Sequence, residues 1–287
     1  MSLSEDAATS FEPHRAHLRG LAYRMLGSVA EAEDAVQDAF LRWYAAERSA
    51  VAEPRAFLIR IVTRLCLDRL KSARAQREQY VGTWLPEPLA DDSSGALAAD
   101  LSVALLMTLE RLSPLERAAF LLHDVFDVDY AEVADTLDRS EEACRQLALR
   151  ARTHVREQRP RFEASEQESE RLASAFHAAM RAGDLAGLTE LLAADAVFYS
   201  DGGGKKAAAL NPIVGRDKIL RLLAGLAAKR SNLTADMVEC TRLNGLPAFV
   251  LRAPEGVETL ALGVNGQKIV ALYSIRNPDK LRHLEPS

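Results

Sequence analysis

Apolar residues recur at helical spacing from residue 11 to about residue 79. Gly27 ends the first predicted helix, and Ser28 with Glu31 forms a capping box at the start of the second. Pro54 suits the first turn of a third helix, because a proline there loses no helical hydrogen bond. The second helix has one apolar face: Ala32, Ala35, Val36, Ala39, Phe40 and Trp43. The pattern predicts an all-helical first domain over residues 1–80.

The third predicted helix combines an apolar face with a basic one. Its apolar positions are Phe57, Leu58, Ile61, Val62, Leu65 and Leu70. Its basic positions are Arg60, Arg64, Arg69, Lys71, Arg74 and Arg77. Basic residues usually lie on a solvated helix face, so this row alone leaves open whether the helix binds an anion.

The helical pattern breaks over residues 81–94. The runs Trp-Leu-Pro-Glu-Pro at 84–88 and Asp-Asp-Ser-Ser-Gly at 91–95 cannot continue a helix. They predict an interdomain linker over residues 81–98. Because a free linker would leave a large indole ring in water, we expect Trp84 to lie against a neighbouring surface.

A second all-helical domain follows over residues 99–161, and a tight turn joins its last two helices. The shorter helix is Ala131–Leu137, and Ser140 caps the helix that follows. Arginines recur along that second helix: Arg145, Arg150, Arg152, Arg156 and Arg159. This arrangement predicts a helix-turn-helix whose second helix enters the DNA major groove. Asp138 and Arg139 occupy the turn, where many such motifs have glycine and an aliphatic residue.

The periodicity changes from Phe176 onward. One or two helices up to about Ala193 precede the extended run Ala196–Tyr199, and another helix is predicted over Lys218–Lys229. Four extended runs follow: Met237–Leu243, Pro247–Arg252, Glu258–Val264 and Lys268–Arg276. Asn-Gly, a strong hairpin signal, joins the first run to the second and the third to the fourth. The pattern predicts an α+β third domain, residues 166–287, with an antiparallel meander behind helices.

Composition narrows the functional classes. A length of 287 residues allows two or three domains, and a net charge of −5 argues against indiscriminate DNA coating while permitting a local basic face. Cys66, Cys144 and Cys240 are far apart, so we expect no disulfide framework, metal or cofactor. The sequence shows neither the apolar core of a signal peptide nor a run of membrane-spanning length. We therefore expect a cytoplasmic protein with no membrane partner.

Three stretches resemble parts of bacterial sigma factors. Glu31–Tyr44 resembles their helix for binding core polymerase, and Pro54–Lys71 resembles their −10 recognition and melting helix. Ser113–Arg152 resembles the −35-binding domain. With no other sigma-type domain between them, this is the layout of the extracytoplasmic-function (ECF) sigma factors.

Three further motifs resemble the signature of one ECF group. They are Trp-Leu-Pro-Glu-Pro at 84–88, Asp-Gly-Gly-Gly-Lys at 201–205 and Asn-Pro-Asp-Lys-Leu at 277–281. That group is ECF41, also called SigJ-like, and it carries a C-terminal SnoaL-like domain of the NTF2-like fold with a curved antiparallel sheet. The resemblance implies a sigma factor whose activity is modulated in cis by this domain, and which is itself no enzyme.

The resemblance also implies the binding residues. For the −35 element they are Arg139, Ser140, Glu141, Glu142, Arg145, Gln146, Arg150 and Arg152. For the −10 element they are Arg60, Arg64, Arg69, Lys71 and Arg74, with a flipped-out base in the loop Glu47–Glu53. Core RNA polymerase, through its β′ and β subunits, would meet Asp34, Gln37 and Asp38. Interdomain contacts are expected at Trp84, Pro86, Asp201, Gly202, Gly203, Gly204, Lys205, Asn277, Pro278, Asp279 and Lys280.

Two other classes of protein stay open from the residues alone. One is a ligand-sensing helix-turn-helix regulator that binds DNA without polymerase, with a small-molecule ligand in the C-terminal domain. The other is a SnoaL-like isomerase or cyclase with an accessory DNA-binding half. Its acid–base residues would come from His177, Tyr199, Asp195, Asp201 and Tyr273. The glycine-rich loop at 201–205 lacks the spacing of a phosphate-binding P-loop.

Overall fold

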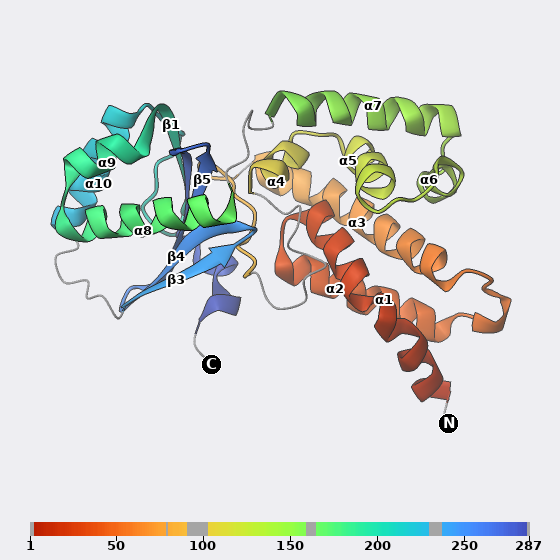
Figure 1. The fold of residues 1–287 in the computed structure, drawn as a ribbon. Coiled ribbons are helices and arrows are strands. Elements are labelled where there is room, and N and C mark those ends of the chain that lie inside the picture. The colour runs from red at the N-terminus through yellow and green to blue at the C-terminus, as the bar shows by residue number, and fades with distance from the viewer. Residues whose placement is uncertain (1–2, 79, 91–102, 159–164, 230–236, 286–287) are drawn as a thin grey trace. The chain divides into compact units, whose positions relative to one another are not determined.

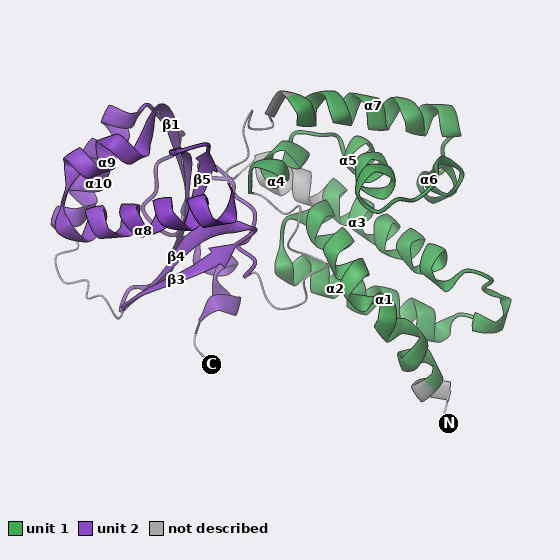
Figure 2. Cartoon of the chain, in the orientation of Figure 1, with its two compact units in different colours: residues 1–78, 92–159 green, residues 79–91, 160–287 purple. Residues whose placement is uncertain are grey.

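The structure, a computed structural model, describes residues 3–78, 80–90, 103–158, 165–229 and 237–285. The chain divides into two compact units (Figure 2). Unit 1 contains residues 1–78 and 92–159, and unit 2 contains residues 79–91 and 160–287. The described part of the predicted interdomain linker, residues 81–90, and Tyr80 before it therefore belong to the C-terminal unit.

Three long helices form the first part of unit 1 (Figure 1). They are α1 (Leu3–Leu26), α2 (Val29–Ala45) and α3 (Pro54–Glu78), with a 3-10 turn, η1, at Arg48–Ala50. Ser28 caps α2 as expected, because its side chain accepts a hydrogen bond from the Glu31 N–H. The predicted apolar stripe of α2 is buried except at Phe40, which is half-buried, and Trp43 at its end is 1 % exposed. The three predicted helices are confirmed.

Further helices form the second part of unit 1. They are α4 (Val103–Glu110), α5 (Pro114–Phe120), a π-helical turn η2 (Leu121–Val125), α6 (Tyr130–Leu137) and α7 (Glu141–Gln158). Ser113 and Glu116 form the expected capping box, with Pro114 at the first helical position. Arg117 of α5 is buried and donates to the carbonyl oxygen of Met25 at 2.6 Å. This buried cation joins the second part of unit 1 to the end of α1.

Unit 2 is an α+β domain (Figure 1). Its helices are α8 (Glu166–Ala182), α9 (Leu185–Leu191) and α10 (Arg216–Lys229). Its strands are β1 (Leu192–Asp201), β2 (Ile213–Val214), β3 (Val238–Leu243), β4 (Leu246–Ala253), β5 (Gly256–Asn265) and β6 (Lys268–Ile275). Two 3-10 turns follow, η4 (Pro278–Lys280) and η5 (Arg282–Leu284). The four predicted extended runs correspond to β3–β6.

The strands form one six-stranded sheet in the order β2-β1-β6-β5-β4-β3. The predicted antiparallel meander is confirmed, since β3 to β6 pair in succession in that sense. The pairing of β1 with β6 is parallel, so the sheet is mixed. Parallel pairing needs a long connection between the two strands, and here α10 and strands β3 to β5 lie between β1 and β6 in sequence. Asn244 takes a positive φ of 53° in the turn between β3 and β4, as an Asn-Gly hairpin requires.

The core of unit 2 lies between the sheet and its three helices. The buried residues that form it are Ala173, Phe176, Ala179, Leu188, Leu192, Ala196, Phe198, Ile219, Leu223, Phe249, Leu262, Ile269 and Leu272. Aromatic and branched side chains fill the interior between the sheet and the helices. This packing fixes the position of β1, which ends at Asp201.

Candidate functional site

The predicted helix-turn-helix consists of α6 and α7. Asp138 ends α6 in the left-handed conformation, with φ 54° and ψ 54°. Its backbone N–H donates to the carbonyl oxygen of Ala134, which closes the helix without a glycine. Ser140 then caps α7 by accepting a hydrogen bond from the Ala143 N–H at 3.2 Å. The unusual turn sequence therefore gives an ordinary helix-turn-helix backbone.

The N-terminal turns of α7 carry exposed polar side chains. Arg145 pairs with Glu141 at 2.5 Å, and its guanidinium lies 5.1 Å from the centre of the Tyr130 ring. Gln146 donates to Glu142 at 3.1 Å. These exposed contacts between neighbouring helical turns are weak, so a base edge or phosphate can replace them.

Two arginines further along α7 are held by carboxylates from other helices. Arg150 pairs with Glu116 at 2.8 Å, and Arg152 pairs with Asp124 at 2.6 Å while donating to the Tyr130 hydroxyl. Burial opposes ionisation of Glu116, but hydrogen bonds from Ser113 and Arg150 lower the pKa of this carboxyl. Both guanidinium groups are thus paired with carboxylates from other elements of unit 1. Arg139, also predicted, is exposed at the turn.

The basic residues of α3 have partners within unit 1. Arg64 donates to the backbone carbonyls of Asp135 and Thr136 at 3.2 and 3.3 Å, at the C-terminal end of α6. Arg60 lies 3.7 Å from the Asp135 carboxylate. The carbonyl groups at a helix C-terminus carry partial negative charge, which favours a cation there. Two predicted −10 contacts therefore meet α6 in this arrangement.

The remaining predicted residues of α3 are distributed differently. Arg69 pairs with Asp38 of α2 at 2.7 Å, so a predicted DNA contact and a predicted polymerase contact meet each other. Lys71 pairs with Asp68 at the surface. Arg74 lies in α3, but its side chain falls outside the described residues. The loop Glu47–Glu53 contains the 3-10 turn η1.

The predicted polymerase-binding face of α2 includes apolar residues that sequence reasoning missed. Asp34 and Gln37 are exposed, whereas Asp38 is half-buried beside Arg69. Leu41 and Tyr44, one and two turns further along, are 57 % and 49 % exposed. Their exposure could have been predicted from the sequence, because both residues lie outside the apolar stripe of this helix. Exposed apolar residues beside acidic ones favour a protein partner over free solvent.

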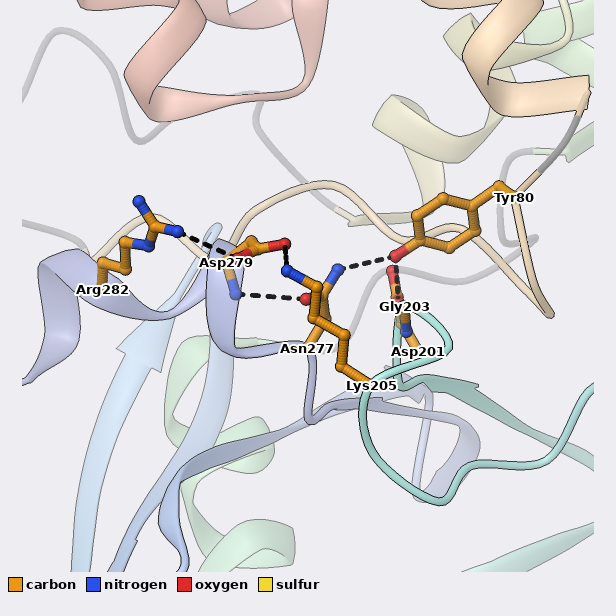
Figure 3. Close-up of polar contacts among 7 residues, drawn as sticks. All are labelled: Tyr80, Asp201, Gly203, Lys205, Asn277, Asp279 and Arg282. Atoms are coloured by element: carbon orange, nitrogen blue, oxygen red, sulfur yellow. Dashed lines mark hydrogen bonds and ion pairs between the residues drawn. The ribbon is translucent and has the colours of Figure 1, made fainter.

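The linker segment, defined as residues 80–90, is held in unit 2 by a buried carboxylate (Figure 3). Asp201, at the end of β1, is fully buried. It accepts hydrogen bonds from the Tyr80 hydroxyl at 2.5 Å and the Leu85 backbone N–H at 2.8 Å. Lys280 forms an ion pair with it at 2.8 Å. A buried carboxylate is stable only when it is paired and hydrogen bonded, so the linker segment supplies partners that Asp201 requires.

Lys280 connects the carboxylate to the Trp-Leu-Pro-Glu-Pro motif. Its ammonium group also donates to the Leu85 carbonyl oxygen and lies 4.1 Å from the centre of the Trp84 ring. The structure thus places Trp84 against unit 2, where the cation stabilises its ring face. Pro86, also predicted as an interdomain contact, is buried beside it.

Tyr80 is a partner of Asp201 that sequence reasoning missed. Burial, followed by the hydrogen bond to Asp201, raises the pKa of the Tyr80 phenol, so the hydroxyl remains a donor at neutral pH. Asn277 donates its side-chain N–H to the same hydroxyl at 2.9 Å. The sequence offered no signal for Tyr80, because it precedes the motif and lies at the end of a helical pattern.

A second set of contacts holds the far end of the linker segment. The backbone N–H of Asn244 donates to the Leu89 carbonyl oxygen at 2.8 Å, and the Asn244 side chain accepts from the Leu89 N–H at 3.0 Å. Ala90 forms an antiparallel bridge with Leu243 of β3. The hairpin between β3 and β4 therefore binds the linker segment as well as turning the chain.

The glycine-rich loop contacts the motif at 277–281 within unit 2. Gly203 takes a φ of 59°, and a Cβ there would lie 2.3 Å from the Asn277 side chain. Only glycine permits this approach. Lys205 pairs with Asp279 at 2.5 Å within unit 2. Of the two charged residues of this loop, Asp201 alone reaches the linker segment among the described residues.

The residues proposed for acid–base catalysis do not assemble into one site. His177 of α8 lies beside Cys240 and Phe249, while Asp195 of β1 is exposed, and no hydrogen bond or ion pair joins the two within the described ranges. Tyr199 and Tyr273 stack at 5.4 Å, and burial raises the pKa of the Tyr273 phenol. These contacts give no pairing of acid and base. No helix among the described residues is long and apolar enough to cross a membrane.

A helix-turn-helix, a second basic helix and an apolar–acidic helix face in one unit define a transcription factor that combines DNA contacts with a protein-docking surface. Comparison with known families agrees. Residues 11–76 match the model of Sigma-70 region 2, and residues 102–155 match that of Sigma-70, region 4.

Whole-chain relatives identify the family. The chain is 40 % identical over 288 residues to the ECF RNA polymerase sigma factor SigJ of Mycobacterium tuberculosis, covering 95 % of this chain and 92 % of that relative. It is 33 % identical to the probable ECF sigma factor SigI of the same species, covering 98 % and 97 %. The crystal structure of the M. tuberculosis SigJ matches with a TM-score of 0.81 and 37 % identity, over 96 % and 98 % of the two chains. This chain belongs to the ECF RNA polymerase sigma factors.

Proposed function

We propose that this sigma factor binds the β′ and β subunits of core RNA polymerase in the cytoplasm and that unit 2 modulates its activity in cis. The chain catalyses no reaction; the polymerase makes the transcript. The face of α2 with Asp34, Gln37 and Leu41 meets the polymerase. The −35 element meets α7, and the −10 element meets α3. The two matched regions, the exposed residues of α2 and α7, and the basic face of α3 support this assignment.

One observation carries the proposal for control in cis. The linker segment lies between region 2 and region 4 in sequence, yet it belongs to the C-terminal unit and supplies partners to the buried Asp201. Capturing this segment shortens the free chain between the two DNA-binding regions. Because the partner is tethered, its effective concentration is high and modest contacts suffice. Unit 2 thereby limits how regions 2 and 4 can be spaced on a promoter.

Transcription with purified core polymerase tests both parts. Promoter-specific transcripts should appear only when this chain is added. A chain ending at residue 276 loses Asn277 and Lys280, and one ending at residue 166 loses nearly all of unit 2. Each should change transcript levels, and by different amounts. If both truncated chains match the full-length protein, control in cis is wrong; if the full chain has no affinity for core polymerase, the sigma assignment is wrong.

A point substitution sharpens the test. Asp201→Asn removes the charge that Lys280 neutralises while keeping the side-chain size. Asp195→Asn makes the same change at an exposed position of the same strand. The proposal expects a changed transcript level for Asp201→Asn and an unchanged one for Asp195→Asn. If the Leu85 amide exchanges faster in Asp201→Asn but transcription equals that of wild type, the linker segment has been loosened without any effect on activity. That result would contradict control through capture of the linker segment.

A further inference from the structure

A cavity of about 480 Å³ lies in unit 2, away from the Asp201 site. One wall is α8 and the other is the hairpin of β3 and β4, which lie together in Figure 1. Apolar groups line it from Ala173, Ala178, Pro247, Ala248 and Phe249. Small-molecule sites commonly measure about 300–1,000 Å³ and combine an apolar lining with a few polar groups. The volume of this cavity lies within that range, and its lining combines apolar and polar side chains.

A thiol and an imidazole meet at this cavity. The Cys240 Sγ lies 3.7 Å from the His177 Nδ1, and the His177 ring packs 5.4 Å from the Phe249 ring. Burial, with the nearby Arg181 charge, lowers the pKa of His177, so its ring is neutral at pH 7 and can accept a proton. Cys240 is exposed, whereas Cys66 and Cys144 are buried. The cavity thus pairs an accessible nucleophile with a base.

We propose that this cavity is an effector site for small organic electrophiles of the α,β-unsaturated carbonyl class, with Cys240 as the nucleophile. The sulfur forms a bond to the β-carbon as the double-bond electrons move to the carbonyl oxygen. His177 accepts the thiol proton and returns it to the α-carbon, so the adduct retains every atom and no oxidant is needed. Arg181 also lines the cavity, and its charge acts on His177, so it can stabilise the negative oxygen during the step.

The walls of the cavity lead to the linker segment. Arg242 lines the cavity, pairs with Glu166 of α8 at 3.2 Å and donates to the Gly245 carbonyl oxygen in the hairpin turn at 2.8 Å. The next residues on the hairpin, Leu243 and Asn244, hold the linker segment. Cys240 lies three residues from Leu243, about 10 Å along the strand. An adduct at Cys240 is therefore positioned to shift the hairpin that grips Leu89 and Ala90.

The chemical part is tested on the full chain without polymerase. N-ethylmaleimide, a small cyclic electrophile of this class, is added at limiting concentration and the adducts are mapped by mass spectrometry. Cys240 should react at least about tenfold faster than Cys66 or Cys144, and His177→Gln should slow it about tenfold, since a positioned base contributes at least that much. His154→Gln, at an exposed position of α7, is the matched control. An unchanged Cys240 rate in His177→Gln would overturn the proposal.

The coupling to the linker is measured by hydrogen exchange on the modified full chain. The Leu89 N–H, bonded to Asn244, should exchange several-fold faster after modification, and the Leu85 N–H, bonded to Asp201, should change less. Cys240→Ser treated in the same way should show no change. Identical Leu89 exchange before and after modification would refute the effector role, although the thiol reacts.

The expected effect on transcription rests on the proposed function, and the experiment distinguishes failure of that function from failure of the effector site. If the unmodified chain directs no promoter-specific transcript, the proposed function is wrong while the adduct and exchange results still stand. If the unmodified chain is active and modification of Cys240 changes Leu89 exchange without changing transcript level, the site is not an effector site. A change in transcript level for wild type but not for Cys240→Ser supports it.

Discussion

Two sets of ion pairs, one in each unit, show how differently the same chemistry is used. The Asp201–Lys280 pair of unit 2 is buried, with side chains 0 % and 9 % exposed. The Arg145–Glu141 pair of α7 in unit 1 is exposed, at 48 % and 47 %. Water competes for the second pair and not for the first.

This difference assigns the two sets to different tasks. A buried carboxylate that loses its partners leaves a charge with nothing to stabilise it, so release of the linker segment from Asp201 is costly. An exposed arginine such as Arg145 can exchange its glutamate for another anion at small energetic cost. We therefore expect the first arrangement to hold the linker segment in unit 2 and the second to leave the α7 surface available for DNA.

The largest effect is expected at the buried pair. Asp201→Ala leaves the Lys280 ammonium buried without its carboxylate and removes the acceptor of Tyr80 and Leu85. Losing one member of a buried pair typically lowers the free energy of unfolding by about 3–5 kcal/mol. Urea denaturation of the full chain, followed by exchange of the sheet amides of unit 2, measures it. Asp195→Ala, on the same strand but exposed, should stay within about 0.5 kcal/mol of wild type.

A loss below about 1 kcal/mol for Asp201→Ala would contradict the comparison. That result would place the carboxylate in the same energetic class as the exposed pairs. The linker segment would then be held mainly by its apolar residues. Restoring the charge balance with Asp201→Leu and Lys280→Met together should recover part of the lost stability, because no unpaired charge remains.

Sequence reasoning found the elements and motifs that depend on local rules. Caps at Ser28, Ser113 and Ser140 and the Asn-Gly turn at Asn244 depend on residues within a few positions, so the helices and hairpins that they bound could be predicted. The parallel pairing of β1 with β6 could not, because it depends on how the whole meander packs on the helices.

Partners in the functional sites were harder to predict than the residues themselves. Asp201 and Lys205 occur in one motif, yet Asp201 is buried under Tyr80 and Lys205 reaches the surface carboxylate of Asp279. Which of two charged neighbours turns inward is decided by backbone geometry at Gly203 and by residues over a hundred positions away. Likewise, the basic pattern of α3 contained no sign that Arg64 would meet the end of α6.

The next effect concerns base recognition by α7. Arg145→Ala should weaken discrimination at one position of the −35 element by about 1–3 kcal/mol, because an arginine bound to a guanine edge contributes that much. Protein stability should hardly change, since the Arg145–Glu141 pair is exposed. Binding of promoter variants by the holoenzyme measures it. Unchanged preference at every −35 position would rule out base reading by Arg145.

A smaller and more uniform effect is expected for the arginines held by carboxylates. Arg152→Gln should weaken binding of all promoter sequences alike and reduce the salt dependence by about one counterion. Asp124 and Tyr130 hold this guanidinium in place, and we expect it to contact a phosphate. Titrations over a range of salt concentrations test it. A loss confined to one promoter sequence would instead assign Arg152 to base reading.

The smallest effect concerns Lys205–Asp279, an exposed ion pair of unit 2. Like the exposed pair of α7, it should contribute little to stability. The hydrogen bond and charge of Lys205, with Arg282, lower the pKa of the Asp279 carboxyl below its usual value near 3.8. A carboxyl with a depressed pKa in the folded state adds stability above its unfolded pKa, and this is lost as the pH falls through the folded one. Because Asp279 is 43 % exposed, the contribution is at most about 1 kcal/mol.

Wild type should therefore lose slightly more stability than Asp279→Asn between pH 5 and pH 3 in matched urea titrations. A difference as large as that of Asp201→Ala would show that exposure does not separate the two classes of ion pair in this protein.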